Sequence, residues 1–271
     1  MKTISKFIFI VLFSIILLIA YLSIFGFETT KFNNKIINKI EKIDKDLKIE
    51  LKKIKIVLNP LELKLSVKTV GPKLKHKNKV INLERINANI LLSSFFNDNF
   101  NVSSLEISTN SLKINDLISF SRSLKQKPEL FILERIIKKG YLVSDINIEF
   151  EPNNGTINDY KIKGFVKDTN INLTNSFDIK DCDLIFILKK DHLEIKDIKF
   201  SLNNLKFFSN KVVAQIYNDK YYSIKGDINN DSTNLTENEI NKFPKNFILK
   251  SNIKKIQFNS KNTFSFKLNK K

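Results

Sequence analysis

The chain has 271 residues, 42% of them hydrophobic, which is enough for a folded body of one large or two small domains. Its single cysteine excludes an intrachain disulfide, and its 6 glycines argue against a glycine-rich phosphate-binding loop. The net charge of +18 comes from lysines spread along the whole chain, so it indicates a compositional bias rather than a binding patch, and no nucleic-acid partner is predicted.

An apolar stretch at residues 7–27 contains no charged residue and follows a short tail at residues 1–6. About 20 apolar residues in a helix cross a bilayer core, where the backbone must satisfy its own hydrogen bonds. Three interpretations compete: a retained anchor, a cleaved secretory signal and a buried soluble helix. The apolar core is longer than that of a signal, and Ala20 has no small partner at a cleavage position, so we predict a retained single-pass anchor.

Residues 28–45 are predicted to form an amphipathic helix, with Thr29 or Thr30 as its N-cap. Apolar side chains recur there at helical spacing, at Phe32, Ile36, Ile37, Ile40 and Ile43. Such a helix can lie on the membrane surface beside the anchor, or it can close the end of a β core. The second interpretation is favoured.

From Leu47 the hydrophobic period changes to two, which predicts a β-rich domain over residues 46–271. A change of phase at Lys52–Lys53 indicates a bulge or bend, Asn59–Pro60 indicates a turn, and Gly71–Pro72 ends the first hairpin. This hairpin has one apolar face and one basic face, and the next strand repeats its alternation. The residues predicted on the apolar face are Ile54, Ile56, Leu58, Leu61, Leu63, Leu65, Val67, Ile86, Ala88 and Ile90.

Two helices interrupt the strands, at residues 115–124 and 130–139, with Pro128 between them and Gly140 as a C-cap. They form a helical insertion at about residues 115–139. A further short helix is predicted at residues 236–242, and a turn at residues 152–155. The sequence therefore predicts a mainly β fold with a few helices, in which a transmembrane helix precedes a long antiparallel sheet that is groove- or sandwich-like.

No pattern in the sequence indicates catalysis or metal binding. The chain has no nucleophile-elbow, phosphate-loop or zinc-protease motif, and His76 and His192 are not spaced as a metal pair. Cys182 lies between Asp181 and Asp183, which should raise rather than lower the pKa of its thiol. We therefore predict that the protein is not an enzyme and that it has no catalytic, cofactor or metal site.

Two stretches carry a resemblance to a known family. The first, IKIVLNPLELKLSVKTV at residues 54–70, is a strand pair broken by a proline. The second, at residues 86–114, has a leucine pair followed by a recurring apolar rhythm, and the segment GYLVSDINIEF at residues 140–150 continues it. After an N-terminal anchor and a short helix, this layout resembles the N-terminal portion of the AsmA-like family of envelope proteins, the family of AsmA, TamB and YhdP. The residues that match the rhythm are Leu91, Leu92, Val102, Leu105, Ile107, Leu112 and Ile114.

The resemblance implies a location and a function. It implies a single-pass protein of the bacterial inner membrane whose C-terminal body lies in the periplasm, although a count of lysines flanking the anchor alone would place that body in the cytoplasm. It also implies an apolar β-groove that handles or transports lipid or supports outer-membrane assembly, with the apolar-face residues toward the lipid. The partners expected are the inner membrane, a phospholipid or other envelope lipid, and envelope proteins. Two alternatives remain: a plain sandwich core, and an anchored β domain that binds a protein by pairing at an edge strand.

Overall fold

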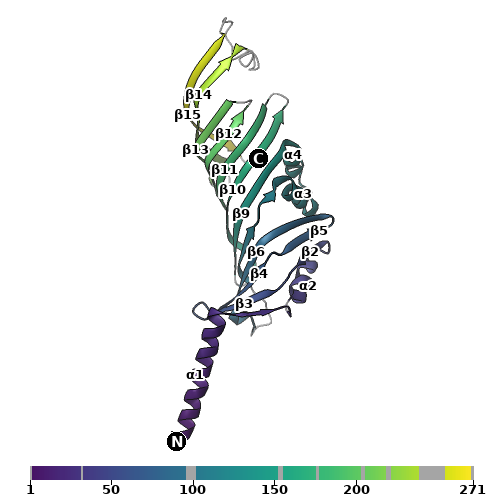
Figure 1. The fold of residues 1–271 in the computed structure, drawn as a ribbon, viewed down its shortest axis with the longest axis vertical. Helices are drawn as coiled ribbons and strands as arrows, with labels where there is room; N and C mark the ends of the chain where they lie inside the picture. The colour runs from purple at the N-terminus through teal and green to yellow at the C-terminus, as the bar shows by residue number, and fades with distance from the viewer. Residues whose placement is uncertain are drawn as a thin grey trace. The chain divides into compact units, whose positions relative to one another are not determined.

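The computed structural model describes residues 2–31, 33–95, 102–151, 155–174, 177–202, 205–217, 221–237 and 254–269. Over this part of the chain it contains four α-helices, one 3₁₀ turn and fifteen strands of one antiparallel sheet (Figure 1). The predicted fold class, mainly β with a few helices and an N-terminal apolar helix, is confirmed.

The elements follow the chain in this order. The helices are α1 (Lys2–Ile24), α2 (Asn33–Ile43), α3 (Ile114–Leu124) and α4 (Pro128–Ile136), with the 3₁₀ turn η1 at Leu92–Phe95. The first eight strands are β1 (Phe27–Thr29), β2 (Leu47–Glu50), β3 (Ile54–Asn59), β4 (Lys64–Val70), β5 (Lys73–His76), β6 (Lys79–Leu91), β7 (Val102–Thr109) and β8 (Leu112–Lys113). The others are β9 (Ile137–Phe150), β10 (Ile157–Thr174), β11 (Phe177–Lys189), β12 (His192–Leu202), β13 (Leu205–Tyr217), β14 (Tyr221–Thr236) and β15 (Lys255–Asn269).

Hydrogen bonds join the strands in the order β1-β3-β4-β6-β7-β9-β10-β11-β12-β13-β14-β15, while β2 pairs with β5, β5 with β6, and β8 with β9. Most neighbours are consecutive in the chain, as expected for antiparallel strands joined by short turns. Contacts divide the chain into two compact units. Unit 1 comprises Met1–Asn110 and Asp145–Tyr160, and unit 2 comprises Ser111–Ser144 and Lys161–Lys271.

Helix α1 contains a segment, Ile4–Ile24, that is long and apolar enough to cross a membrane; its most apolar window has no buried residue, and Leu22 and Ser23 near its end are half-buried. At 1.5 Å per residue its 21 residues span about 32 Å, close to the thickness of a bilayer core. The helix begins earlier than the predicted start at residue 7 and ends before residue 27. It ends because Gly26 turns the chain with φ +63°, and a Cβ there would lie only 2.3 Å from the carbonyl oxygen of Ile56.

Helix α2 is shorter than the predicted range of 28–45, because Thr29 belongs to β1 and the helix begins at Asn33. The predicted caps act outside the helix: the Thr29 hydroxyl accepts the N–H of Lys31, and the Thr30 carbonyl accepts that of Asn33. The Asn33 side chain donates to the carbonyl oxygen of Lys52 at 2.8 Å, and α2 contacts β2. These contacts agree with a helix that closes one end of the β core.

Unit 1 bends at Lys52–Lys53 and at Gly71–Pro72, and at these two places strand pairing passes from one part of the sheet to another. The two places together are called the bend below. The predicted bend at Lys52–Lys53 separates β2 from β3, and β3 pairs with β4 whereas β2 pairs with β5. The dipeptide Gly71–Pro72, which was expected to end the hairpin, is a bend between β4 and β5. There the N–H of Leu83 donates to the Pro72 carbonyl at 2.9 Å, so β6 runs alongside the chain at Gly71–Pro72. Buried apolar side chains around this bend are Ile49, Ile54, Pro72, Ile81 and Leu83.

The helical insertion of unit 2 consists of α3 and α4, which an ion pair between Arg122 and Glu134 connects. Pro128 begins α4, where its missing N–H costs nothing. The second helix ends at Ile136, before the predicted residue 139, and Gly140 lies within β9 rather than capping the helix. Gly140 has φ +150°, and a Cβ there would lie 2.4 Å from the Thr169 hydroxyl, so close packing and not helix termination requires this glycine.

Three aspartates of unit 2 adopt left-handed backbone conformations inside consecutive strands: Asp168, Asp181 and Asp197, with φ between 50° and 51°. Each follows an aliphatic residue and a lysine, at VKD, IKD and IKD. Register shifts accompany all three in the pairing of β10, β11 and β12, as β-bulges require; the third is the step from the pair Asp183–Lys199 to the pair Ile185–Lys196. Of the other sequence predictions, residues 152–154 and most of the helix at 236–242 lie outside the described residues, and β14 extends to Thr236.

Candidate functional site

One face of unit 1 carries a continuous set of apolar side chains. Partners across antiparallel strands lie on the same face, so the pairing register identifies three rows, here called the apolar face. The middle row contains Phe27, Ile56, Val67, Ala88, Leu105 and Ile148. The row beside the β3–β4 turn contains Leu58, Leu65, Ile90 and Val102, and the row beside the bend contains Thr29, Ile54, Thr69, Ile86, Ile107 and Ile146.

Eight of the ten residues predicted on the apolar face lie in these rows. The structure adds side chains from β1, β7 and β9. Alternation in the sequence indicated the strands β7 and β9 but not their pairing, whereas β1 was not predicted, because Phe27 was assigned to the anchor and Thr29 to a helix cap. The predicted members in the rows are Ile54, Ile56, Leu58, Leu65, Val67, Ile86, Ala88 and Ile90.

Leu61 and Leu63 lie outside the apolar face, in contrast to the sequence prediction. The strands close at the pair Asn59 and Lys64, so residues 60–63 form the turn and do not continue the alternation. The Asn59 side chain accepts the N–H of Glu62 at 3.2 Å, and Leu63 reverses the chain with φ +50°. Consequently the side chains of Leu61 and Leu63 are 95% and 63% exposed.

Burial varies along the apolar face. Ile54 is fully buried and Ile56 is 7% exposed, so the face is covered at these two residues of β3. Beyond β3, Thr69 and Ile90 are also buried, at 7% and 5% exposure, whereas Val67, Ala88 and Leu105 are half-buried, as are the other partners on β6, β7 and β9. A second sheet packed across the whole face would bury the central side chains completely. The apolar face is therefore closed near β3 and partly open from β4 to β9.

The opposite face of the same strands is polar. Its side chains pair across the strands: Ser66 donates to Asn89, Asn89 donates to Ser104 at 2.9 Å, and Asn87 donates to Glu106 at 3.0 Å. The difference between the faces follows from the period of two in β4, β6 and β7. Asn87 and Ser108 on this polar face are nevertheless buried, at 8% and 7% exposure, so solvent does not reach all of it. In a sheet with one polar and one apolar face, the apolar face is the one that has to be covered.

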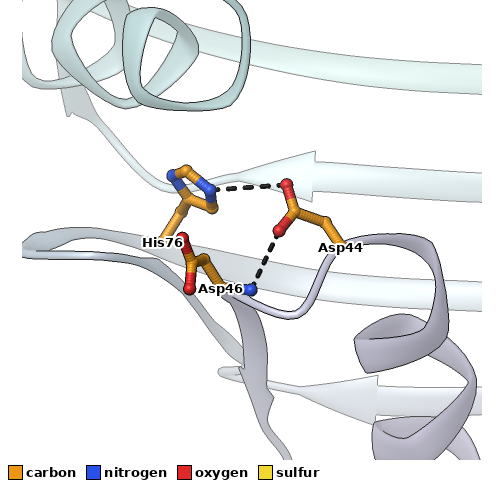
Figure 2. Close-up of side chains that lie close together, drawn as sticks. All are labelled: Asp44, Asp46 and His76. Atoms are coloured by element: carbon orange, nitrogen blue, oxygen red, sulfur yellow. Dashed lines mark hydrogen bonds and ion pairs between the residues drawn. The ribbon is translucent and has the colours of Figure 1, made fainter.

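A cluster of His76, Asp44 and Asp46 lies in unit 1 where α2 ends beside β5 (Figure 2). The imidazole of His76 is 2% exposed, and its Nε2 lies 3.4 Å from Oδ2 of Asp44, whose Oδ1 accepts the N–H of Asp46 at 2.9 Å. Imidazole nitrogens and carboxylate oxygens can bind a divalent cation, and the possible ligand atoms of these three residues lie within 4.8 Å of one another. Both oxygens of the Asp44 carboxylate already have a polar neighbour, so we interpret the cluster as a polar contact that holds the end of α2 against β5.

No sequence signal could have identified this cluster. His76 and Asp44 are far apart in the chain, and they meet because Leu47 of β2 is the cross-strand partner of His76. The expectation that the chain has no metal site stays a prediction.

Cys182 is buried in β11, at 7% exposure. Burial, with a smaller contribution from the charge of Asp183, raises the pKa of its thiol to about 11. The thiol is therefore protonated near neutral pH and is a poor nucleophile there. The sequence predicted this rise in the thiol pKa from the flanking aspartates, but burial is the larger cause.

Unit 2 has a polar depression of about 500 Å³ at the bulge of β13, next to β14 and β15. Asp227 accepts the N–H groups of Asn210 and Lys211 at 3.1 and 3.0 Å. Desolvation raises the pKa of Asp227, but these amides and the Asn229 and Ser209 side chains outweigh it and lower the pKa below its usual range. The carboxylate therefore has its hydrogen-bonding capacity filled by the bulge, which is a structural role.

Comparison with known proteins gives no relative for this chain. No family model matches it, no curated protein matches it and no solved structure matches it. Among the arrangements described above, the apolar face is the one with unfilled binding capacity, and it is the candidate functional site.

Proposed function

We propose that this chain is an anchored protein of the bacterial cell envelope that handles lipid on its apolar face. In this proposal α1 crosses the inner membrane once, and both compact units lie in the periplasm. The resemblance to AsmA-like proteins suggests the location and the lipid, and the half-buried apolar rows from β4 to β9 are the single observation that supports lipid binding.

The dimensions of the apolar face suit an acyl chain. The open part has four strands, β4, β6, β7 and β9, and at a spacing of about 4.8 Å its rows are about 14 Å long. One leaflet of a bilayer core is about 15 Å deep, so most of an acyl chain can lie along an open row in contact with aliphatic side chains. Each Å² of apolar surface removed from water contributes about 25 cal/mol, which favours occupation of the half-exposed rows.

The test is the lipid that co-purifies with the full chain in mild detergent, measured by native mass spectrometry and by lipid extraction. Two neighbouring residues of β4 supply a matched pair, because Val67 lies on the apolar face and Lys68 on the opposite face, and both are half-buried. Val67→Glu and Lys68→Gln each lower the net charge by one, so attraction to anionic headgroups changes equally in both.

We expect wild type and Lys68→Gln to carry phospholipid, and Val67→Glu to lose most of it while keeping its fold. A folded wild-type protein without lipid, or equal lipid in both variants, would contradict lipid handling by the apolar face.

A second candidate function rests on β15. This strand has 15 residues and ends the strand order, so within the described chain no strand pairs with its outer edge. Phe266 and Leu268 are 44% and 50% exposed there, which leaves backbone and apolar side chains accessible to a partner strand. In this alternative the anchored body binds an extended segment of an envelope protein. A polypeptide in the same native mass spectra, with no phospholipid, would favour it.

A further inference from the structure

The β3–β4 turn lies beside the end of α1. The hydroxyl of Ser23, within the membrane-crossing segment, donates to the carbonyl oxygen of Leu58 at 2.8 Å. Leu58 is separated from Leu61 by two residues, so at about 3.3 Å per residue the tip of the turn is within about 10 Å of this contact. The last turns of α1 and the β3–β4 turn are therefore at the same level of unit 1.

The direction of the strands points the turn toward the membrane. β1 follows α1 and pairs antiparallel to β3, with Phe27 opposite Ile56. Moving back along β1 into α1 is therefore the same direction as moving forward along β3 into the turn. Figure 1 shows α1 leaving unit 1 beside β3.

The turn exposes apolar side chains at this end of the unit. Leu61 and Leu63 are 95% and 63% exposed, and the N–H of Leu92, at the start of η1, donates to the Leu63 carbonyl at 2.8 Å. Glu62, between the two leucines, forms an ion pair with Lys64 at 2.8 Å. This pair is compatible with the membrane interface, because the apolar stem of a lysine can lie among lipids while its charged end stays in the polar headgroup region. Tyr21 in the last turn of α1 contacts Phe25, which follows the helix, and aromatic rings at this position are typical of the membrane interface.

We propose that the β3–β4 turn docks on the bilayer that α1 crosses, with Leu61 and Leu63 inserted among the lipids at the interface. The inference rests on the anchor of the proposed function, but it does not require that the apolar face carries lipid. Two contacts, the helix and the turn, would then hold unit 1 against the membrane surface, whereas the helix alone would let it pivot.

The test places a fluorophore at the turn of the full chain in vesicles of phosphatidylethanolamine and phosphatidylglycerol. Single cysteines are introduced in a Cys182→Ala background at Leu61, and labelled with an environment-sensitive dye. A matched control is Val80→Cys, which replaces another exposed aliphatic residue, 45% exposed. Val80 lies near the start of β6, whereas Leu91 at the other end of β6 pairs with Lys64 beside the turn. Leu17→Cys in α1 gives the reference for a site inside the bilayer.

We expect lipids with a nitroxide on the acyl chain near the headgroup to quench the Leu61→Cys dye several-fold more than the Val80→Cys dye. Aqueous iodide should show the reverse order. If iodide quenches both dyes equally, or if neither quencher reaches the Leu61→Cys dye because protein covers it, the docking is wrong. Co-purified lipid is measured on the same protein in detergent, before it is placed in vesicles. Bound lipid with a turn exposed to water would support the proposed function and contradict the docking, and an inserted turn without bound lipid would support the docking and contradict the proposed function.

Discussion

Two substitutions on the apolar face test whether it is closed at β3 and open beyond it. Ile54→Ala and Leu65→Ala each delete three carbon atoms from a strand of the same hairpin. Ile54 is fully buried, so its truncation loses about 2.4 kcal/mol of transfer free energy and leaves a cavity, for a total of about 2–5 kcal/mol. Leu65 is half-buried, and water or lipid can enter the space that it leaves, so its truncation should cost only about 1 kcal/mol.

Hydrogen-exchange mass spectrometry of the full chain measures these costs locally, because two compact units need not unfold together. We expect amides of β3, β4 and β6 to exchange about 30- to 4,000-fold faster in Ile54→Ala and about fivefold faster in Leu65→Ala, since each 1.4 kcal/mol is a factor of ten. Peptides of β12 and β13 in unit 2 provide the internal control. Equal acceleration by the two variants would mean that the whole face is a closed core, which would refute the open part on which lipid binding depends.

Four further predictions follow from single residues. Gly26→Val should loosen the junction of α1 with β1, because it puts a branched side chain at φ +63° against the Ile56 carbonyl; limited proteolysis should release α1 faster, and an unchanged rate would contradict the role of this turn. Leu63→Asp should leave the melting temperature within a few degrees of wild type, since the side chain is 63% exposed; a collapse would put Leu63 in a core. The Cys182 thiol should resist iodoacetamide at pH 8 in the folded chain and react in denaturant. Folding raises the pKa of this thiol from 9.0 to about 11, so its contribution to the free energy of unfolding is fully present below pH 9 and is lost as the pH rises toward 11. Urea unfolding at several pH values measures this loss. An alkaline phosphatase fusion after Lys271 should be active if the body lies in the periplasm, and an inactive fusion with an active cytoplasmic reporter would reverse the orientation.

The rival interpretations of the apolar face differ in what covers it. A sandwich needs a second sheet over the middle row of the apolar face. Val67, Ala88 and Leu105 of that row are half-buried, whereas a second sheet would bury them fully. A groove needs a ligand that the chain itself does not supply. The full burial of Ile54 beside the bend shows that part of the face is an ordinary core, so any groove begins beyond β3.

The sequence by itself determined the features that depend on local periodicity. An uncharged apolar run sets a membrane-length helix, and a period of two sets strands with one apolar side, so α1 and eight of the ten apolar-face residues were predictable. It failed where one residue changes the backbone path. Leu61 and Leu63 keep the alternating pattern, but the turn closes at Asn59 and Lys64, and a pattern cannot tell a strand residue from a turn residue with φ +50°.

Only the tertiary structure decided which strands are neighbours. Pairing joins rows across β1, β3, β4, β6, β7 and β9, and it brings His76 to Asp44, because hydrogen bonds between strands connect residues that no local period relates. It also decided the degree of burial along the apolar face, since Ile54 and Val67 have the same aliphatic character in the sequence and differ only in what packs above them. The bulges at Asp168, Asp181 and Asp197 belong to the same class, because a left-handed aspartate is stable only where the neighbouring strand accepts the extra residue.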